Sequence, residues 1–334
     1  MTYLSWLIDR TPTKWWHDSA EAAELDLAME RGAIGATTNP LLSAAALKTD
    51  RALWSADIEE VLARNLPAEQ KAEALMRIPV TRTAAKLQGR PGLVCAQVNP
   101  VRAGDRECML SMARRMHAWA PNISVKLPAT AAGLDVLEEC VAEGISVTAT
   151  VSFTVPQLVA IAERHRAGSL RARQNGIEPG ACCAVIMIGR LDDYLREIAH
   201  DTQAPVEESD LRLAGLAVTK RAYALYQERG YEAVLLVAAL RGDYHLTELA
   251  GADLVMSIHP SYQKNFVTKD LPQEERIGCP VPPEAIERLS VMPEFVRSFE
   301  PDGMSPRDFM AFGLTQRTLS QFNESGWKLM EGYR

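Results

Sequence analysis

The sequence predicts an α/β protein built as a closed (β/α)8 barrel with additional helices at its C-terminal end. Short apolar runs with strand character alternate with longer helical segments along the 334 residues, a pattern typical of βαβ units and a parallel sheet. Eight such runs are present, the number that a closed barrel requires. Neither G-x-G-x-x-G nor G-x-x-x-x-G-K-[ST] follows a run, so the open nucleotide-binding sheets lack their main sequence signature.

The eight predicted strands are short, rich in β-branched or small apolar residues, and followed by polar or turn-forming residues. In chain order they cover residues 5–9, 35–39, 93–99, 123–127, 145–152, 181–189, 232–240 and 252–258. The first of them, SWLID, places Asp9 at a strand end.

Helices are predicted between the strands by start and stop signals and by apolar spacing. The main ones cover 18–32, 43–65, 67–78, 135–144 and 212–230. Two further helical segments, 282–292 and 305–332, lie beyond the eight repeats. We therefore expect a barrel over residues 1–260 and a C-terminal helical extension over 261–334 packed on the same domain.

Composition narrows the function classes. The net charge of −7 argues against non-specific binding to nucleic acid or to an anionic membrane, and no apolar run is long enough to span a bilayer. The N-terminus lacks the basic start and long apolar stretch of a signal peptide. Six cysteines are scattered without a C-x-x-C pair, which indicates a reducing cytosol and neither a disulfide framework nor a zinc site.

Lys126 is the residue that most suggests chemistry. It lies in ISVKLP, where apolar residues alternate with Ser124 and Lys126 before Pro128 ends the run. In a barrel, alternate residues of each strand point inward and functional residues gather at the C-terminal strand ends. Helices cover the outer face of βαβ units, so the polar face has to be the inner one.

The residues with the same parity as Lys126 are largely polar, which predicts a hydroxyl-lined pocket around the lysine. They are Asp9, Thr37, Asn39, Cys95, Gln97, Asn99, Ser124, Ser146, Thr148, Thr150, Ser152 and Arg241. The sixth strand departs from the pattern with Val185 and Met187, followed by Arg190.

Such an environment solvates an ammonium group poorly, so we expect the pKa of Lys126 to fall and its neutral amine to act as a nucleophile toward a carbonyl. The alternative is a structural role, in which the lysine pairs with Asp9 or another acid.

Seven segments, taken in order, resemble motifs of the transaldolase family, which also includes fructose-6-phosphate aldolases. They are GATTNP (35–40), AQVNP (96–100), VKLPATAAGL (125–134), EGISVTATVSFTVPQ (143–157), IGRLDD (188–193), LLVAALR (235–241) and LAGADLVMSIHP (249–260). The resemblance covers about residues 5 to 260 and implies a TIM barrel that carries out Schiff-base aldol chemistry without a metal or cofactor.

The resemblance also implies roles for individual residues. Lys126 stands at the position of the Schiff-base lysine, and Asp9 at that of the acid/base aspartate. Thr150 matches the threonine that helps to hold the catalytic water, with Gln97 beside it. The implied substrate-binding residues are Asn39, Thr37, Thr148, Arg190 and Arg241. Of these, Asn39 holds hydroxyls of the three-carbon unit, and the two arginines clamp the substrate phosphate.

Four positions depart from the family pattern. Gln97 replaces the glutamate of typical transaldolases, as it does in the aldolase branch, and Met187 replaces a phenylalanine or tyrosine. Thr148 replaces a common asparagine, and Val185 a common serine near the phosphate. A glutamine can orient water but cannot take its proton. These changes leave open an aldolase that releases dihydroxyacetone, and also a transaldolase that acts on a different anionic sugar.

The sequence interpretation is thus a cytoplasmic transaldolase that transfers a dihydroxyacetone unit between sugar phosphates such as fructose 6-phosphate or sedoheptulose 7-phosphate and an aldose phosphate. Such an enzyme would act in carbohydrate metabolism, in the pentose phosphate pathway. The alternatives are the aldolase and a non-catalytic barrel that binds an anionic sugar. A metal-dependent hydrolase is disfavoured, because the sequence contains no paired histidine motif. The tail, with Phe309, Phe312 and Trp327, is expected to cover the barrel mouth, to form a homodimer contact, or simply to pack.

Overall fold

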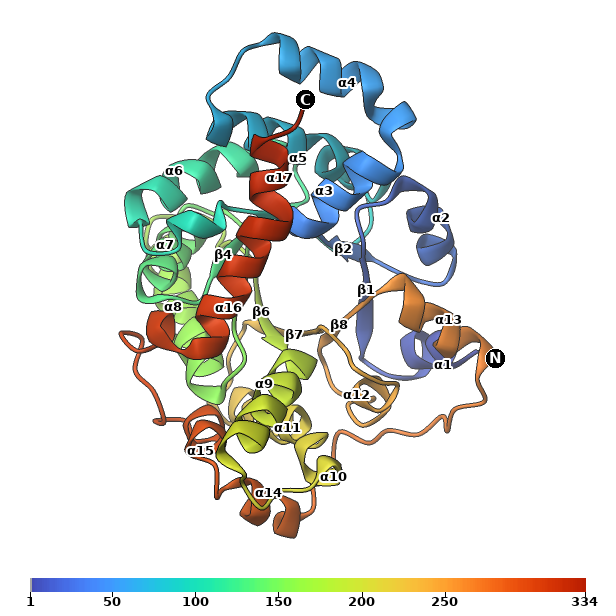
Figure 1. The fold of residues 1–334 in the computed structure, drawn as a ribbon, viewed down its shortest axis with the longest axis vertical. Helices are drawn as coiled ribbons and strands as arrows, with labels where there is room; N and C mark the ends of the chain where they lie inside the picture. The colour runs from blue at the N-terminus through green and yellow to red at the C-terminus, as the bar shows by residue number, and fades with distance from the viewer. Residues whose placement is uncertain (1) are drawn as a thin grey trace.

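The computed structural model describes residues 2–334, which form a closed barrel of eight parallel strands in sequential order (Figure 1). The strands are β1 (Lys14–Asp18), β2 (Gly35–Thr37), β3 (Val94–Gln97), β4 (Ile123–Pro128), β5 (Val147–Thr150), β6 (Cys182–Met187), β7 (Val234–Ala238) and β8 (Val255–Ile258). Pairing of β1 with β8 closes the barrel. The predicted (β/α)8 architecture is confirmed.

Helices follow the strands and surround the barrel (Figure 1). They are α1 (Tyr3–Arg10), α2 (Ala22–Glu30), α3 (Pro40–Thr49), α4 (Arg51–Ala63), α5 (Ala68–Lys86), α6 (Arg106–His117), α7 (Ala131–Ala142), α8 (Val155–Gln174), α9 (Ile188–Thr202), α10 (Glu208–Leu211), α11 (Ala214–Arg229), α12 (Tyr244–Thr247) and α13 (Pro260–Thr268), with the short 3-10 helix η1 (Pro100–Arg102) after β3.

The first predicted strand was wrong, because residues 5–9 lie within helix α1. Its buried side chains include Tyr3, Leu4 and Leu7, a spacing that places them on one face of a helix. Thr2 caps the helix by accepting a hydrogen bond from the backbone N–H of Ser5. The first strand of the barrel is instead the KWWHD segment of β1, which pairs with β2 and β8. The other seven predicted strands each overlap an observed strand.

Gly35 at the start of β2 makes room for a large interior side chain. A Cβ atom at this position would lie 2.8 Å from the indole ring of Trp16 and 2.6 Å from the carbonyl oxygen of Leu93. Trp16 is the strand partner of Gly35 in β1 and is 3% exposed. The glycine therefore lets an indole ring fill the barrel interior below the strand ends.

Three of the residues that share the parity of Lys126 lie together inside the barrel. Ser124 and Thr148 lie on neighbouring strands, and their hydroxyl oxygens are 2.7 Å apart. The Cys95 thiol lies 3.6 Å from the same Thr148 hydroxyl. All three side chains are buried. They form a hydrogen-bonded floor, so polar groups in this layer satisfy one another.

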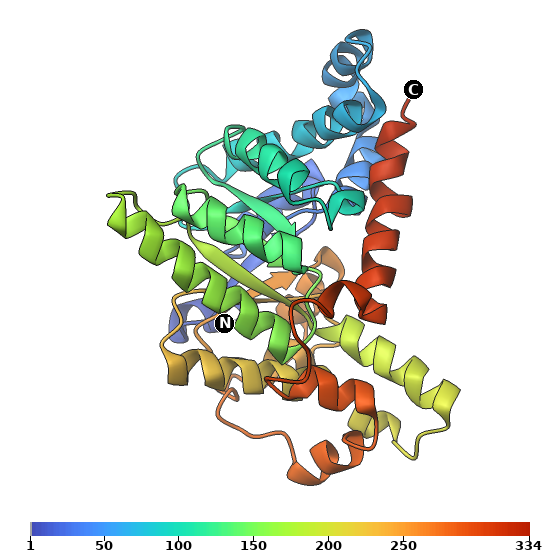
Figure 2. The same cartoon turned by 90° about the vertical axis from the view of Figure 1, so that its left-hand side faces the viewer.

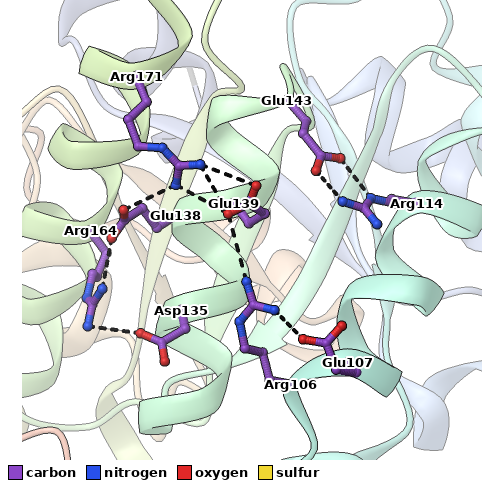
Figure 3. Close-up of polar contacts among 9 residues, drawn as sticks. All are labelled: Arg106, Glu107, Arg114, Asp135, Glu138, Glu139, Glu143, Arg164 and Arg171. Carbon is purple, nitrogen blue, oxygen red and sulfur yellow. Dashed lines mark hydrogen bonds and ion pairs between the residues drawn. The ribbon is translucent and has the colours of Figure 1, made fainter.

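A network of ion pairs joins α6, α7 and α8 on the outside of the barrel (Figure 3). Arg171 on α8 contacts both Glu138 and Glu139 on α7, and Arg106 at the start of α6 reaches Glu139 from the other side. The remaining contacts in this ion-pair network are Arg164 with Asp135 and Glu138, Arg106 with Glu107, and Arg114 with Glu143.

The C-terminal tail returns across the end of the barrel at which the strands finish. It contains α14 (Pro283–Leu289), α15 (Pro293–Phe299), η2 (Phe309–Ala311), α16 (Gly313–Phe322), the short π-helix η3 (Asn323–Trp327) and α17 (Lys328–Glu331). α16 packs against η1 and α9, η3 against α3, and α17 against α5. Figure 2 shows α16 and α17 in red along one side of the molecule. The predicted boundary between the barrel and the C-terminal extension, at residue 260, coincides with the first residue of α13. The division into these two parts stays a prediction.

Candidate active site

A cavity of about 100 Å³ lies at the carboxyl ends of the strands. Its lining combines one lysine, one aspartate, one arginine and several hydroxyl and apolar side chains. The lining residues are Asp18, Thr37, Asn39, Lys126, Thr150, Val185, Met187, Arg190, Leu236, Ala238, Ala239, Ser257 and Phe322. In a parallel barrel this end is where ligands bind and catalytic side chains gather.

Lys126 on β4 is 6% exposed and lines this cavity. Its Nζ donates a hydrogen bond to the backbone carbonyl of Thr38 at 3.2 Å. Within residues 2–334 no carboxylate lies within ion-pair distance of the lysine, so the structural pairing with an acid considered above is not observed. The amine is held by a single neutral acceptor and faces the cavity.

The carboxylate of the cavity is Asp18, not Asp9. Asp18 is the last residue of β1 and accepts a hydrogen bond from the Thr37 hydroxyl at 2.8 Å. Asp9 lies in α1, is exposed, and is not among the residues that line the cavity. The premise that Asp9 ends the first strand was therefore wrong.

Sequence reasoning missed Asp18 because DS (18–19) looked like the start of a helix. The helix α2 begins four residues later, and its N-cap is Glu21. A usable signal was present in KWWHD, where Lys14, Trp16 and Asp18 share one parity and a polar residue ends the run. Ser257 of β8 was also missed, and its hydroxyl is hydrogen-bonded to that of Thr37.

Gln97 and Thr150 lie on the two strands that flank Lys126. Gln97 is the strand partner of Lys126, and Thr150 that of Pro128. Thr150 lines the cavity, whereas Gln97 does not. Both side chains are buried, and within residues 2–334 the Oε1 atom of Gln97 and the Oγ1 atom of Thr150 have no hydrogen-bond partner. Buried polar atoms of this kind are costly unless a ligand or water satisfies them.

Three further predicted substrate-binding residues differ in position. Thr37 and Asn39 line the cavity. Asn39 also caps α3, because its Oδ1 accepts a hydrogen bond from the backbone N–H of Leu42 at 2.9 Å. Thr148 belongs to the hydroxyl floor below and does not line the cavity, so its contact with substrate stays a prediction.

Arg190 forms the cationic side of the cavity. It is in the first turn of α9, and its Nη1 lies 3.5 Å from the Thr318 hydroxyl of α16. Burial lowers the pKa of its guanidinium group to about 10, with a smaller contribution from the positive charge of Arg241. Its buried Nε has no hydrogen-bond partner within residues 2–334. A desolvated guanidinium with a free donor is suited to an anion.

Arg241 follows β7 and lies outside the residues that line the cavity. Its Nε donates to Asp193 at 2.7 Å, and its Nη1 donates to the backbone carbonyls of Ala239 and Leu240, each at 3.1 Å. Arg241 also approaches the helix that carries Arg190, because a Cβ atom at Gly189 would lie 2.3 Å from Cγ of Arg241. The anion clamp formed by the two arginines stays a prediction.

The C-terminal tail forms one wall of the cavity, and the sequence analysis did not predict which of its residues would do so. Phe322 at the end of α16 lines the cavity, and the Arg190 guanidinium lies 5.6 Å from its ring centre. Phe309, Phe312 and Trp327 are almost completely buried, so of their three expected roles they fill that of packing. The spacing of Leu314, Thr318 and Phe322 places them on one face of α16, but this spacing alone does not reveal what the face covers.

A larger groove of about 700 Å³ lies on the outside, between α4, α5 and α6. Its charged residues include the ion pairs Arg82–Asp57 and Arg115–Glu73. No lysine or cysteine lines it, so it offers no nucleophile comparable to Lys126. Separately, no group of three or more His, Cys, Asp or Glu side chains in the described part of the chain is arranged to hold a metal ion. The expectation of a metal-free and cofactor-free site stays a prediction.

A family model described as transaldolase/fructose-6-phosphate aldolase matches residues 15–332. The chain belongs to this family. The match begins within β1 and extends through the tail helices, so both the barrel and the α16 wall fall inside it.

Among individual proteins, the chain is 28% identical over 217 residues to transaldolase 1 of Streptomyces avermitilis. The aligned region covers 61% of this chain and 56% of that protein. It is 31% identical over 211 residues to a transaldolase of Mycolicibacterium paratuberculosis, covering 58% and 55%. It is 30% identical over 226 residues to a transaldolase of Neisseria gonorrhoeae, covering 62% and 59%. The matched region thus spans little more than half the length of these relatives.

Proposed function

We propose that this protein is a transaldolase that transfers a dihydroxyacetone unit from a ketose phosphate to an aldose phosphate through a Schiff base on Lys126. The observation that carries the proposal is the cavity in which a buried lysine amine, the Asp18 carboxylate and the Arg190 guanidinium all meet. Support also comes from the family to which the chain belongs and from relatives named transaldolase.

In the first half-reaction, the neutral amine of Lys126 adds to the ketone carbon of the donor, and the carbonyl oxygen leaves as water. The resulting iminium accepts electrons. Asp18 takes the proton of the C4 hydroxyl as the C3–C4 bond breaks, and the bonding electrons form an enamine on Lys126. The shortened aldehyde then leaves. Arg190 and Arg241 hold the anionic end of the donor, and Asn39 donates to hydroxyls of the three-carbon unit.

In the second half-reaction, the enamine carbon adds to the aldehyde of an acceptor, and protonated Asp18 returns its proton to the new hydroxyl. Water then adds to the iminium and releases the product ketose from Lys126. We expect Gln97 and Thr150 to hold that water, because within residues 2–334 the Gln97 Oε1 and Thr150 Oγ1 atoms have no hydrogen-bond partner. Because an amide cannot accept its proton, Asp18 carries the proton transfers.

The second candidate is an aldolase that protonates the enamine and releases free dihydroxyacetone. Gln97 favours it, because that residue is shared with the aldolase branch of the family, whereas Met187 in the cavity wall does not. Val185 also lines the cavity and offers no hydrogen bond to a phosphate, which favours a donor with a different anionic terminus. A non-catalytic barrel that binds an anionic sugar is the third candidate.

One experiment separates these candidates. The protein is incubated with fructose 6-phosphate, with and without erythrose 4-phosphate, and sedoheptulose 7-phosphate and dihydroxyacetone are measured by mass spectrometry. If the protein is a transaldolase, we expect sedoheptulose 7-phosphate and little free dihydroxyacetone. We expect Lys126→Met to abolish the formation of sedoheptulose 7-phosphate. Free dihydroxyacetone without the seven-carbon product would identify the aldolase. Binding of fructose 6-phosphate without either product would contradict both enzymes for this donor.

We place this activity in cytoplasmic carbohydrate metabolism, in reactions of the pentose phosphate type, and expect no nucleic-acid partner. None of the helices within residues 2–334 is long and apolar enough to cross a membrane. The homodimer is also a proposal, and light scattering at several protein concentrations tests it.

A further inference from the structure

A buried histidine–aspartate pair lies behind the cationic side of the cavity, where the proposed reaction does not use it. His245 in α12 and Asp192 in α9 are both completely buried, and Nε2 of the histidine lies 2.9 Å from Oδ2 of the aspartate. The other oxygen of Asp192 accepts the backbone N–H of Gly215, at the start of α11, at 2.8 Å. The pair therefore joins three helices that surround the end of β7.

The second ring nitrogen of His245 fixes the protonation pattern of this pair. Its Nδ1 accepts the backbone N–H of Arg241 at 3.1 Å. Because Nδ1 is an acceptor, the ring proton is on Nε2 and is donated to Asp192. The contacts thus form a directed chain from the N–H of Arg241 through His245 to Asp192.

The backbone that leads to Arg241 is strained and closely packed. Ala239, two residues earlier, has a φ of 60°, a conformation that costs free energy for a residue other than glycine. Gly189 lies against it, since a Cβ atom there would be 2.4 Å from the Ala239 carbonyl oxygen and 2.3 Å from Cγ of Arg241. Strain of this kind persists only where surrounding contacts enforce it.

Two consecutive aspartates of α9 therefore hold Arg241 at two points. Asp193 accepts from its Nε at 2.7 Å, and Asp192 holds its backbone N–H through His245. The same helix carries Arg190 in its first turn. The position of Arg241 thus depends on contacts with the helix that carries Arg190.

We propose that His245 is a positioning residue, which transmits the hold of Asp192 to the main chain of Arg241 and so sets the distance between the two arginines that bind the anionic end of the substrate. This inference rests on the proposed function, because it assigns an anion to the Arg190–Arg241 side of the cavity. It goes beyond that function in making anion selectivity depend on a histidine that touches no substrate.

Two substitutions separate the two bonds of the imidazole ring. In His245→Asn the amide oxygen lies close to the position of Nδ1 and retains the acceptor for Arg241, but the contact with Asp192 is lost. In His245→Gln the longer side chain retains a donor for Asp192 and loses the acceptor. His165→Asn is the matched control, because His165 is also buried and contacts the carbonyl of Gly180 before β6.

The readout is the ratio of kcat/KM for fructose 6-phosphate to that for unphosphorylated fructose. We expect His245→Gln to lower this ratio by about 10- to 100-fold, the size expected when a positioned group is displaced, mainly through a higher KM for the phosphorylated donor. His245→Asn retains most of the ratio, and His165→Asn leaves it unchanged. Thermal unfolding of each variant reports the effect on stability separately.

Equal losses with both donors in His245→Gln would overturn the proposal, since the pair would then only stabilise the fold. Equal losses of the ratio in His245→Asn and His245→Gln would overturn it too, because the acceptor for Arg241 would not matter. If the wild-type protein turns over neither donor, the proposed function fails, and calorimetric binding of inorganic phosphate replaces the kinetic ratio. Weaker phosphate binding in His245→Gln than in His245→Asn would still support the positioning role, and identical binding would refute it.

Discussion

Asp9 and Asp18 each end a short apolar segment near the N-terminus, yet they lie in different environments. Asp18 ends a strand of a parallel barrel, where the carboxyl end faces the cavity. Asp9 lies on the solvent side of a helix. The difference follows from the period of the apolar residues around each carboxylate.

This contrast gives a matched pair of variants. Asp18→Asn removes the proposed proton acceptor and is expected to lower kcat for cleavage of fructose 6-phosphate by about 10²- to 10⁴-fold. Asp9→Asn is expected to leave kcat unchanged. Formation of the Schiff base with dihydroxyacetone, trapped by borohydride, checks that Lys126 remains reactive in both variants. A large loss of kcat in Asp9→Asn, or none in Asp18→Asn, would contradict the assignment.

At the level of single residues, strand alternation was enough to predict that Thr37, Lys126 and Thr150 face one interior. Such alternation describes a strand, so it works only for residues inside or directly after one. It could not predict that Phe322 closes the cavity, because that contact joins residues far apart in the sequence. Nor could it show that the Thr148 hydroxyl is hydrogen-bonded to Ser124 and Cys95 in the floor below the cavity.

Among the elements, β1 and α13 are joined by a buried histidine that the cavity does not contain. His17 of β1 is completely buried, and its Nδ1 lies 2.9 Å from Nε2 of Gln263 in α13. The Gln263 amide also donates to the Ile258 carbonyl at the end of β8. Burial lowers the pKa of His17 to about 4, with a smaller contribution from the charge of His259.

The stability of the protein should therefore fall on mild acidification. The unfolded chain binds a proton at His17 below about pH 6.5, whereas the folded chain does so only near pH 4. The contribution of neutral His17 is fully present above pH 6.5 and is lost as the pH falls toward 4, by at most about 3 kcal/mol. Urea unfolding at several pH values measures it.

His17→Asn preserves an acceptor for Gln263 but cannot titrate in this range, so its unfolding free energy should depend less on pH between 6.5 and 4. His200→Asn is the control, since the His200 side chain is 88% exposed. An identical pH dependence in wild type and His17→Asn would show that the buried ring does not contribute.

The helices and strands also differ in how well the sequence predicted them. Seven strands could be located because apolar residues alternate or run together between helical segments. SWLID contains too few residues to distinguish a strand from one helical turn, and the helical spacing becomes visible only when Tyr3 and Leu4 are included. The tail helices were predictable as helices, but amphipathic spacing does not specify the surface on which they pack.

For the molecule as a whole, the ion-pair network on α6, α7 and α8 ties neighbouring outer helices together (Figure 3). Arg106, Arg164 and Arg171 are each about two-fifths exposed, so every single pair contributes little. A shared acid is different, because Glu139 lies between two arginines from different helices.

Glu139→Gln should lower the free energy of unfolding by about 1 kcal/mol or less at low salt, and by clearly less in 1 M NaCl, where exposed charges are screened. Glu59→Gln is the control, because this exposed residue of α4 forms no ion pair within residues 2–334. Chemical unfolding at both salt concentrations gives the difference. A loss that does not depend on salt would show that Glu139 acts through packing and not through charge.

The central claim for the whole protein is that Lys126 forms a Schiff base with a ketose. The most direct test is peptide mass spectrometry after borohydride reduction in the presence of fructose 6-phosphate. A reduced three-carbon adduct on the peptide that contains Lys126 is predicted, together with its absence in Lys126→Met. An adduct on another lysine, or none with either fructose 6-phosphate or dihydroxyacetone, would contradict the account.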